Sequence, residues 1–270
     1  MKEKDLKTIV REKYGRIAAH ADALSGQSGC WSGSGCCGPA YTTFNENYEE
    51  LAGYAADADL GLGCGLPTEF AGLKPGQSVL DLGSGAGNDC FVARAIVGES
   101  GWVTGLDFSD EMLERARKNA KKLGHLNVDF IAGDIDEMPL DNDRFDVVLS
   151  NCVLNLVPDK TKAFSEVFRV LKPGGHFCIS DVVLQGELPD ALKTDAEMYA
   201  GCVSGALSHE EYMEKIGQAG FSNIRVHKVR QIEIPKEIFY KYLSVEAYHQ
   251  FNKEGRGIFS LTISADKPAV

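Results

Sequence analysis

The sequence of 270 residues contains no run of about 18 apolar residues, and no apolar segment follows the opening Met-Lys-Glu-Lys-Asp-Leu-Lys. We therefore expect neither a membrane-spanning helix nor a secretory signal, and we expect a cytoplasmic location. A surplus of basic residues is also missing, because 28 Lys and Arg stand against 39 Asp and Glu and give a net charge of −11. Such an acidic chain is poorly suited to the phosphates of a nucleic acid, so we expect no nucleic-acid partner.

The eight cysteines do not indicate a disulfide scaffold. The chain is long, the cysteines are unevenly spread, and 44% of the residues are hydrophobic, which suffices for a core without covalent staples. The cysteines are therefore interpreted as reduced thiols that either pack in the core or perform chemistry. Cys90 and Cys178 lie within a helix pattern and a strand pattern, and we interpret both as core residues.

A glycine-rich turn is the most informative motif. The buried-strand pattern Val79-Leu80-Asp81-Leu82 runs into Gly83-Ser84-Gly85-Ala86-Gly87, and a helix pattern over Cys90 to Val97 follows. Glycines at alternate positions let the backbone approach a ligand closely, and the amides at the start of the next helix face that ligand. The motif predicts a nucleoside-cofactor site.

Further strand patterns follow at regular intervals. Residues 102–107 end in Asp107, residues 128–135 contain Asp134, and residues 145–151 form a fourth strand pattern. A turn over 171–175 leads into a fifth strand over 176–183. Alternation of strand and helix from Ser78 to about Val183 predicts a parallel sheet with right-handed crossovers and a ligand beyond the carboxyl ends of the strands.

This series of motifs resembles the class I S-adenosylmethionine-dependent methyltransferases over roughly residues 73–185. Asp107 suits the two hydroxyls of a ribose and Asp134 suits an adenine amino group, although both could instead be helix caps. The alternative fold-level interpretation is a generic doubly wound domain that binds NAD or nothing. The expected cofactor-binding residues are Asp81, Gly83, Ser84, Gly85, Gly87, Asp107, Phe108, Asp134, Ile135 and Asn151.

Outside this core the patterns are looser. Residues 1–22 show helical periodicity, and residues 25–39 are too rich in Gly and Ser for a regular element. After Val183 we expect helices over 188–203 and 209–219 and strands over 224–229 and 259–265. The predicted organisation is an N-terminal helix with Cys-bearing loops (1–65), a Rossmann-like α/β core (66–185) and a substrate-covering α+β region (186–270).

The usual groups for activating a methyl acceptor are missing. The Asn/Asp-Pro-Pro-aromatic sequence of many enzymes that methylate amino groups of nucleic acids is absent after the fourth strand, where Ser150-Asn151-Cys152-Val153-Leu154-Asn155 stands. None of the six histidines lies in a motif that marks it as a general base. The acceptor chemistry must therefore come from other residues.

Cysteines occupy the positions where an acceptor is expected. Cys64 lies in a glycine-flanked turn before Pro67, a favoured first residue of a helix, whose dipole should favour the thiolate. Cys152 follows the fourth strand, and Cys202 lies beyond the fifth strand among small residues. Three soft thiolates suit a thiophilic centre, and trivalent arsenic fits best because three sulfurs leave its lone pair free.

Four motifs make the resemblance closer: Gly63-Cys64-Gly65, the glycine-rich turn, Ser150 to Lys160, and Gly201-Cys202 followed by Gly205-Ala206. Together with the opening Val10 to Gly15, they resemble the arsenite S-adenosylmethionine methyltransferases from about residue 8 to the C-terminus. The resemblance implies that Cys64, Cys152 and Cys202 bind arsenic(III) and act in catalysis. It also implies a thiol reductant, thioredoxin or glutathione.

The family often pairs the Cys64 position with an N-terminal cysteine as a disulfide. Cys30, Cys36 and Cys37 are the candidates here, and they are also possible accessory arsenic ligands. Alternatives remain open at this stage: Cys152 and Cys202 as buried structural cysteines, or a zinc-binding or exposed loop at Cys30, Cys36 and Cys37. Two other functions also remain, methylation of a small organic acceptor such as a quinone precursor or sterol, and a metalloid-binding protein without turnover.

Overall fold

The computed structural model describes residues 3–24, 46–186, 202–203, 205–232, 240, 244–253 and 256–269. Cys30, Cys36 and Cys37 lie outside the described residues, as does nearly all of the helix predicted over 188–203. Within the described ranges no helix has the length and apolar character needed to cross a membrane.

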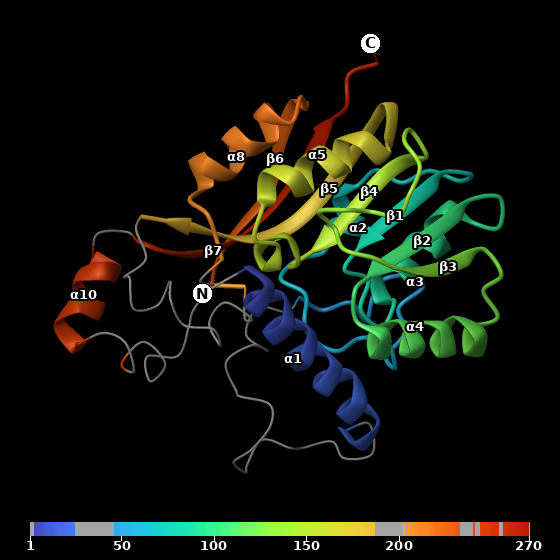
Figure 1. The fold of residues 1–270 in the computed structure, drawn as a ribbon, viewed down its shortest axis with the longest axis horizontal. Coiled ribbons are helices and arrows are strands. Elements are labelled where there is room, and N and C mark those ends of the chain that lie inside the picture. Colours follow the sequence, from blue (N-terminus) through green and yellow to red (C-terminus); the bar gives the residue numbers. More distant parts are fainter. Residues whose placement is uncertain are drawn as a thin grey trace.

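One seven-stranded sheet forms the centre of the molecule, in the order β3-β2-β1-β4-β5-β7-β6 (Figure 1). Strands β1 to β5 are paired in parallel, and β7 runs antiparallel to both β5 and β6. This mostly parallel sheet confirms the predicted class I methyltransferase, Rossmann-like α/β fold. The strands are β1 (Ser78–Leu82), β2 (Trp102–Asp107), β3 (Val128–Ala132), β4 (Phe145–Asn151), β5 (Leu171–Gln185), β6 (Ser222–Ile232) and β7 (Gly257–Asp266).

Helices cover both faces of the sheet because successive strand residues point to opposite sides. Val79 and Val147 pack with side chains of α3 and α4, whereas Leu80 and Val148 pack with side chains of α5 and α8. A long N-terminal helix, α1, contacts α4. The helices are α1 (Glu3–Leu24), α2 (Pro67–Phe70), α3 (Asn88–Val97), α4 (Asp110–Leu123), the 3-10 turn η1 (Leu154–Leu156), α5 (Lys160–Val170), α8 (His209–Gln218) and α10 (Val245–Lys253).

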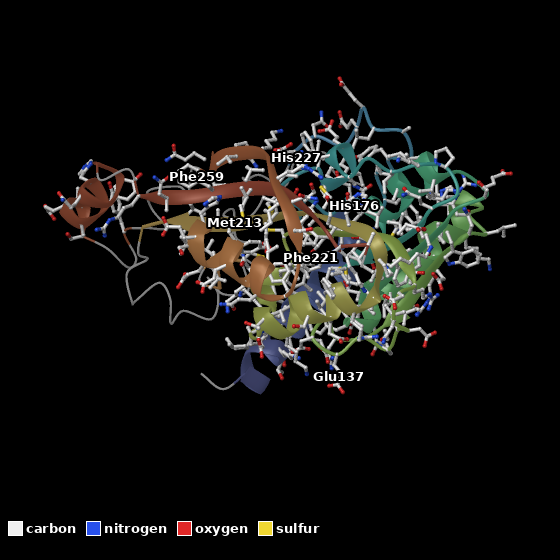
Figure 2. The ribbon with its side chains drawn as sticks, turned by 90° about the horizontal axis from the view of Figure 1, so that it is seen from above. Glu137, His176, Met213, Phe221, His227 and Phe259 are labelled. Atoms are coloured by element: carbon white, nitrogen blue, oxygen red, sulfur yellow. The ribbon has the colours of Figure 1, made fainter. Side chains whose placement is uncertain are left out.

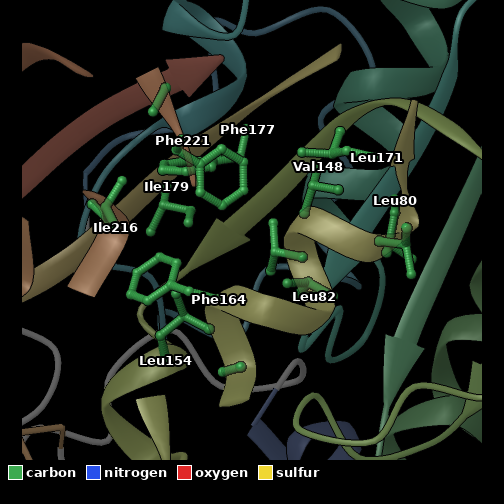
Figure 3. Close-up of a cluster of buried hydrophobic side chains, with 14 of the residues drawn as sticks. Leu80, Leu82, Val148, Leu154, Phe164, Leu171, Phe177, Ile179, Ile216 and Phe221 are labelled. Carbon is green, nitrogen blue, oxygen red and sulfur yellow. The ribbon is translucent and has the colours of Figure 1, made fainter. Parts of the chain in front are cut away.

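The face beneath α5 and α8 holds an aromatic core (Figure 3). The ring of Phe177 on β5 lies 4.7 Å from that of Phe221 at an interplanar angle of 85° and 6.1 Å from that of Phe164 on α5. Such edge-to-face and tilted contacts add to the free energy of burying the rings. This core holds β5 in place. Residues that follow β5 in the sequence form part of the candidate site.

Two histidines hold the short helix α2 against the sheet. His227 on β6 stacks on Phe70 with ring centroids 5.4 Å apart, and Nε2 of His176 on β5 lies 2.6 Å from the carbonyl oxygen of Ala71 (Figure 2). Both side chains therefore have packing or hydrogen-bonding contacts outside the candidate site. They fix the segment that follows Cys64.

Most predicted elements are present, with shifted ends. The strand predicted over 128–135 ends at Ala132, and β5 begins at Leu171 rather than at His176. The pairing of β4 with β5 shifts register between Phe145 and Val147, so the predicted turn over 171–175 is a bulge within the strand. The helix α10 was not predicted, although Ser244 precedes it and accepts from the backbone N–H of Ala247 at 3.2 Å, as the residue before a helix often does.

We predict that Phe177→Ala lowers the free energy of unfolding by about 3–5 kcal/mol, because it empties a fully buried ring site. Leu126→Ala is the control: Leu126 is 91% exposed, and its removal should change stability by no more than about 0.5 kcal/mol. Urea unfolding followed by circular dichroism measures both. Equal effects of the two substitutions would contradict the assigned core.

Candidate functional site

A cleft lies at the carboxyl ends of the parallel strands, where ligands of such sheets bind. It encloses about 1120 Å³, its open mouth included, and we call it the glycine-loop pocket. Nine of the ten residues expected to bind the cofactor line it. They are Asp81, Gly83, Ser84, Gly85, Asp107, Phe108, Asp134, Ile135 and Asn151.

Each glycine of the loop is required for a different structural reason. Gly83 has φ +65°, and a Cβ there would lie 2.4 Å from Val153. Gly85, at φ +51°, faces open space in the pocket and donates its N–H to Asp107 Oδ2 at 2.9 Å. Gly87 is not a lining residue: it precedes α3 at φ +98°, and a Cβ there would meet the rings of Phe91 and Phe130. Its conformation serves the turn and the packing of the helix.

The lining of the pocket fits a cationic nucleoside. The Oγ of Ser84 is buried and has no hydrogen-bond partner, so a ligand hydroxyl or amino group can satisfy it. Gly85 leaves room for a ligand against the backbone. The buried carboxyl groups of Asp81 and Asp107 and the half-buried Asp89 surround the same space. Buried acids favour a ligand that brings positive charge, such as an ammonium or a sulfonium group.

The two acids after β2 and β3 lie at the pocket as expected. Asp107 accepts from the backbone N–H groups of Gly85 and Ser109, each at 2.9 Å, while Ser109 is the residue that caps α4. Burial raises the pKa of Asp107, although these backbone hydrogen bonds oppose that shift. Asp134 lies 3.6 Å from the ammonium of Lys7, a residue of α1.

Asn151 connects the pocket to the turn that carries Cys64. Its Oδ1 accepts from the backbone N–H of Cys64 at 2.9 Å, and its Nδ2 donates to the carbonyl oxygen of Gly65 at 2.9 Å. The same Nδ2 lies 2.6 Å from the hydroxyl of Tyr48 and 3.1 Å from Asp89. Because these contacts use most of its hydrogen-bonding groups, Asn151 positions Cys64 as well as lining the pocket.

Three thiols come together beside the pocket, from segments far apart in the sequence. Cys64, Cys152 and Cys202 are all buried, with exposed fractions of 0%, 4% and 3%. The Sγ of Cys202 donates to the carbonyl oxygen of Cys152 at 2.9 Å, and the Sγ atoms of Cys64 and Cys152 lie within 4.8 Å of each other. We call these three residues the thiol cluster. Of the three, only Cys152 also lines the glycine-loop pocket.

The thiol cluster is not ionised at rest. Burial raises the pKa of Cys64, so the predicted thiolate character from a helix dipole is wrong. The helix α2 does begin at Pro67 as expected, but it has only four residues. Its dipole is too weak to offset the effect of burial on the pKa of the thiol. The hydrogen bond with Cys152 and burial raise the pKa of Cys202 well above its ordinary value.

The backbone at two of these cysteines is unusual. Cys152 has φ 60° and Cys202 has φ 66°, a left-handed region in which L-residues other than Gly, Asn and Asp are uncommon. A residue in this region costs of order 1 kcal/mol or more and is retained when the surroundings impose it. Two of the three residues of the thiol cluster therefore have this uncommon conformation.

Two sets of residues at the site were not predicted. Tyr14 on α1 lines the pocket, and burial followed by charge interactions with Cys202 and Cys152 raises the pKa of its phenol. The opening motif drew attention to this tyrosine without giving it a role. Asp181 and Lys160 are buried near the thiol cluster, and burial raises the pKa of Asp181 to about 7 and lowers that of Lys160 to about 8.

The pH dependence of stability tests the electrostatics around Asn151. Burial raises the pKa of Asp89 to about 6, against the hydrogen bonds from Asn151 and Tyr48. The folded state therefore holds this proton more tightly than the unfolded state, so the contribution is present below about pH 4 and is lost as pH rises through about 6.

We predict that Asp89→Asn gains stability relative to the wild type between pH 4 and pH 7, by up to about 3 kcal/mol at about 1.4 kcal/mol per unit of pKa. Asp146→Asn, on a half-exposed carboxylate paired with Lys172, is the control for loss of a charge. Denaturant unfolding at several pH values measures the difference. A constant difference across this range would contradict the raised pKa.

Known proteins resemble the chain at the level of both sequence and structure. A sequence profile described as a methyltransferase domain matches residues 73–239. An arsenite methyltransferase of Halobacterium salinarum is 39% identical over 98% of this chain and 67% of its own length. The human arsenite methyltransferase is 41% identical over 58% of this chain, and the match spans 44% of the human protein.

A crystal structure of an arsenic(III) S-adenosylmethionine methyltransferase from Chlamydomonas reinhardtii is also similar, with a TM-score of 0.65 and 34% identity over 76% of this chain and 68% of that chain. The chain thus spans about two thirds of the algal and halobacterial proteins and less than half of the human one. With the fold, the pocket and the thiol cluster in agreement, this protein belongs to the family of arsenite methyltransferases.

Proposed function

We propose that this protein transfers the methyl group of S-adenosylmethionine to trivalent arsenic held by Cys64, Cys152 and Cys202. The observation that carries the proposal is the position of Cys152, which lines the glycine-loop pocket and lies beside both other cysteines. An arsenic atom on these sulfurs would lie at the wall of the pocket. Its lone pair is the acceptor that the sequence otherwise lacks.

Arsenic loads onto the thiols by ligand exchange. Three neutral thiols replace the three hydroxyl groups of arsenous acid, each thiol proton leaves with one hydroxyl, and three water molecules are released. A glutathione or other thiol complex of arsenic exchanges in the same way, with free thiol as the leaving group. The bound centre is neutral, which suits a buried site.

The pocket residues position the reaction. S-adenosylmethionine, when bound, supplies a methyl group on a sulfonium sulfur, and Asp107, Asp134 and Ser84 are proposed to hold its nucleoside part. Asn151 fixes Cys64, and the rings and helix that enclose the cluster keep water away from the arsenic. Positioning and desolvation supply most of the acceleration, because the sulfonium loses its charge in the transition state.

Electrons must return to arsenic after each transfer. Attack by the lone pair raises arsenic formally from the trivalent to the pentavalent state, and two thiolates return two electrons by forming a disulfide. We propose that thioredoxin or glutathione reopens this disulfide, that Cys30, Cys36 or Cys37 takes part in it, and that the protein works in the cytoplasm. The three-part organisation into residues 1–65, 66–185 and 186–270 stays a prediction.

We predict that Cys152→Ser and Cys202→Ser each reduce arsenite methylation by at least 100-fold while leaving the affinity for S-adenosylmethionine within about threefold, because a serine hydroxyl is a hard, poor ligand for arsenic. The control is Cys178→Ser, which changes a buried cysteine in the core on the far side of β5. Labelled cofactor, arsenite and thiol are incubated together, and the arsenic species are separated over time.

The same experiment separates the alternatives. Full activity of both serine variants on arsenite would contradict the thiol mechanism. No methylation of arsenite by the wild type, with methylation of a quinone precursor or sterol that both serine variants retain, would identify a small organic acceptor. Tight arsenite binding without any methylated product would identify a metalloid-binding protein.

A further inference from the structure

A buried carboxyl group lies next to the thiol cluster and has no role in the proposed methyl transfer. A carboxylate oxygen of Asp181 and the Sγ atoms of Cys64 and Cys152 all lie within 4.8 Å of one another. All three residues are buried, with Asp181 exposed by 1%. Among the described residues this is the one group of three His, Cys, Asp or Glu side chains whose ligating atoms all lie within 4.8 Å of one another, and the Sγ of Cys202 is not part of it.

The hydrogen bonds of Asp181 leave one position on its carboxylate open. Its Oδ1 accepts from Asn155 Nδ2 at 2.9 Å and from the backbone N–H of Val182 at 3.0 Å, while Oδ2 accepts from the hydroxyl of Tyr212 at 3.1 Å. An ionised carboxylate has about four lone-pair sites, so one site on Oδ2 remains. Donors that hold a carboxylate in this way are the usual support of a metal ligand.

Two sulfurs and one oxygen do not match the needs of arsenic. Trivalent arsenic in the proposed site takes three sulfurs and must keep its lone pair free, so a carboxylate has no place on it. Zinc and its heavier relatives instead accept sulfur and carboxylate oxygen together in tetrahedral sites. With zinc–sulfur bonds of about 2.3 Å, two sulfurs on one tetrahedral zinc lie about 3.8 Å apart, which is within the 4.8 Å that bounds the separations of these atoms.

The charge around the cluster also suits a divalent cation. Two thiolates and one carboxylate carry three negative charges, which a divalent cation reduces to one. The ammonium of Lys160, exposed by 6%, lies close enough to interact electrostatically with both Asp181 and Cys202. It donates to the carbonyl oxygens of Asn155 and Val157 rather than to a carboxylate. The positive charge of this ammonium balances the one negative charge that remains on the cation and its three ligands.

We propose that Cys64, Cys152 and Asp181 form a binding site for a thiophilic divalent cation of the zinc group, separate in its ligand set from the three-thiol site for arsenic. Binding releases the two thiol protons to solvent and leaves a fourth position on the cation open to Cys202 or water. Because Cys64 and Cys152 belong to both sets, such a cation and trivalent arsenic exclude each other. Zinc-group cations are then competitive inhibitors with respect to arsenite.

The test uses the full chain without S-adenosylmethionine or arsenite, in a thiol-free reductant. Cys30, Cys36 and Cys37 are changed to Ser in every variant so that they bind no metal. Cadmium is titrated in, and the ultraviolet sulfur-to-cadmium charge-transfer band is recorded in competition with a chelator. We expect one equivalent to bind, with at least tenfold weaker affinity in Asp181→Asn and loss of the band in Cys152→Ser.

Asp146→Asn is the matched control, since it removes a carboxylate that pairs with Lys172 away from the thiols, and it should bind cadmium like the parent. Arsenite affinity of Asp181→Asn should stay within about twofold, which separates this proposal from the proposed function. Cadmium-113 NMR of the unsubstituted site is a second measurement. We expect a chemical shift between those of all-sulfur and all-oxygen sites. An all-sulfur shift, or equal cadmium affinity in Asp181→Asn and the parent, would overturn the proposal.

Discussion

The hydrogen bonds of one amide side chain determine whether the thiol cluster exists. Cys64 lies outside the sheet, in a turn that reaches the core only because Asn151, the last residue of β4, accepts from its N–H and donates to the next carbonyl. The glycines on either side permit this approach: a Cβ at Gly63 would lie 2.7 Å from Asn151, and one at Gly65 would lie 2.5 Å from Ser180. Ser260 on β7 closes the turn by donating to the carbonyl oxygen of Cys64 at 2.5 Å.

The same amide joins the two halves of the site. Asn151 also contacts Asp89 and Tyr48, which line the glycine-loop pocket, so the position of the Cys64 thiol depends on the residues that would hold the cofactor. Cys152 follows Asn151 directly and has a left-handed backbone. One strand end therefore fixes two of the three sulfurs and one wall of the pocket.

The sequence predicted the fold and the three thiols, but not the groups that support them. Repeated strand and glycine patterns are local, so β1, β2 and β4 were located within a residue of their ends. Asp181 is brought to the cluster by tertiary packing, and nothing at its own position indicates it. Tyr14 and Lys160 lie within motifs of the resemblance, but those motifs gave neither residue a role. The helix after Cys64 was also predicted, but the expected lowering of the thiol pKa by that helix was wrong. Burial raises this pKa, and burial depends on segments distant in sequence.

Burial also explains which ligands the cluster can accept. Neutral thiols cost little in an apolar site, whereas three uncompensated thiolates would cost several kcal/mol each. Trivalent arsenic cancels three thiolate charges, so its complex is neutral and leaves Asp181 and Lys160 to balance each other. A divalent cation needs both of these residues to reach the same balance. The buried acid and base therefore make the cluster compatible with two kinds of centre, of which only trivalent arsenic has a lone pair that can attack a methyl group.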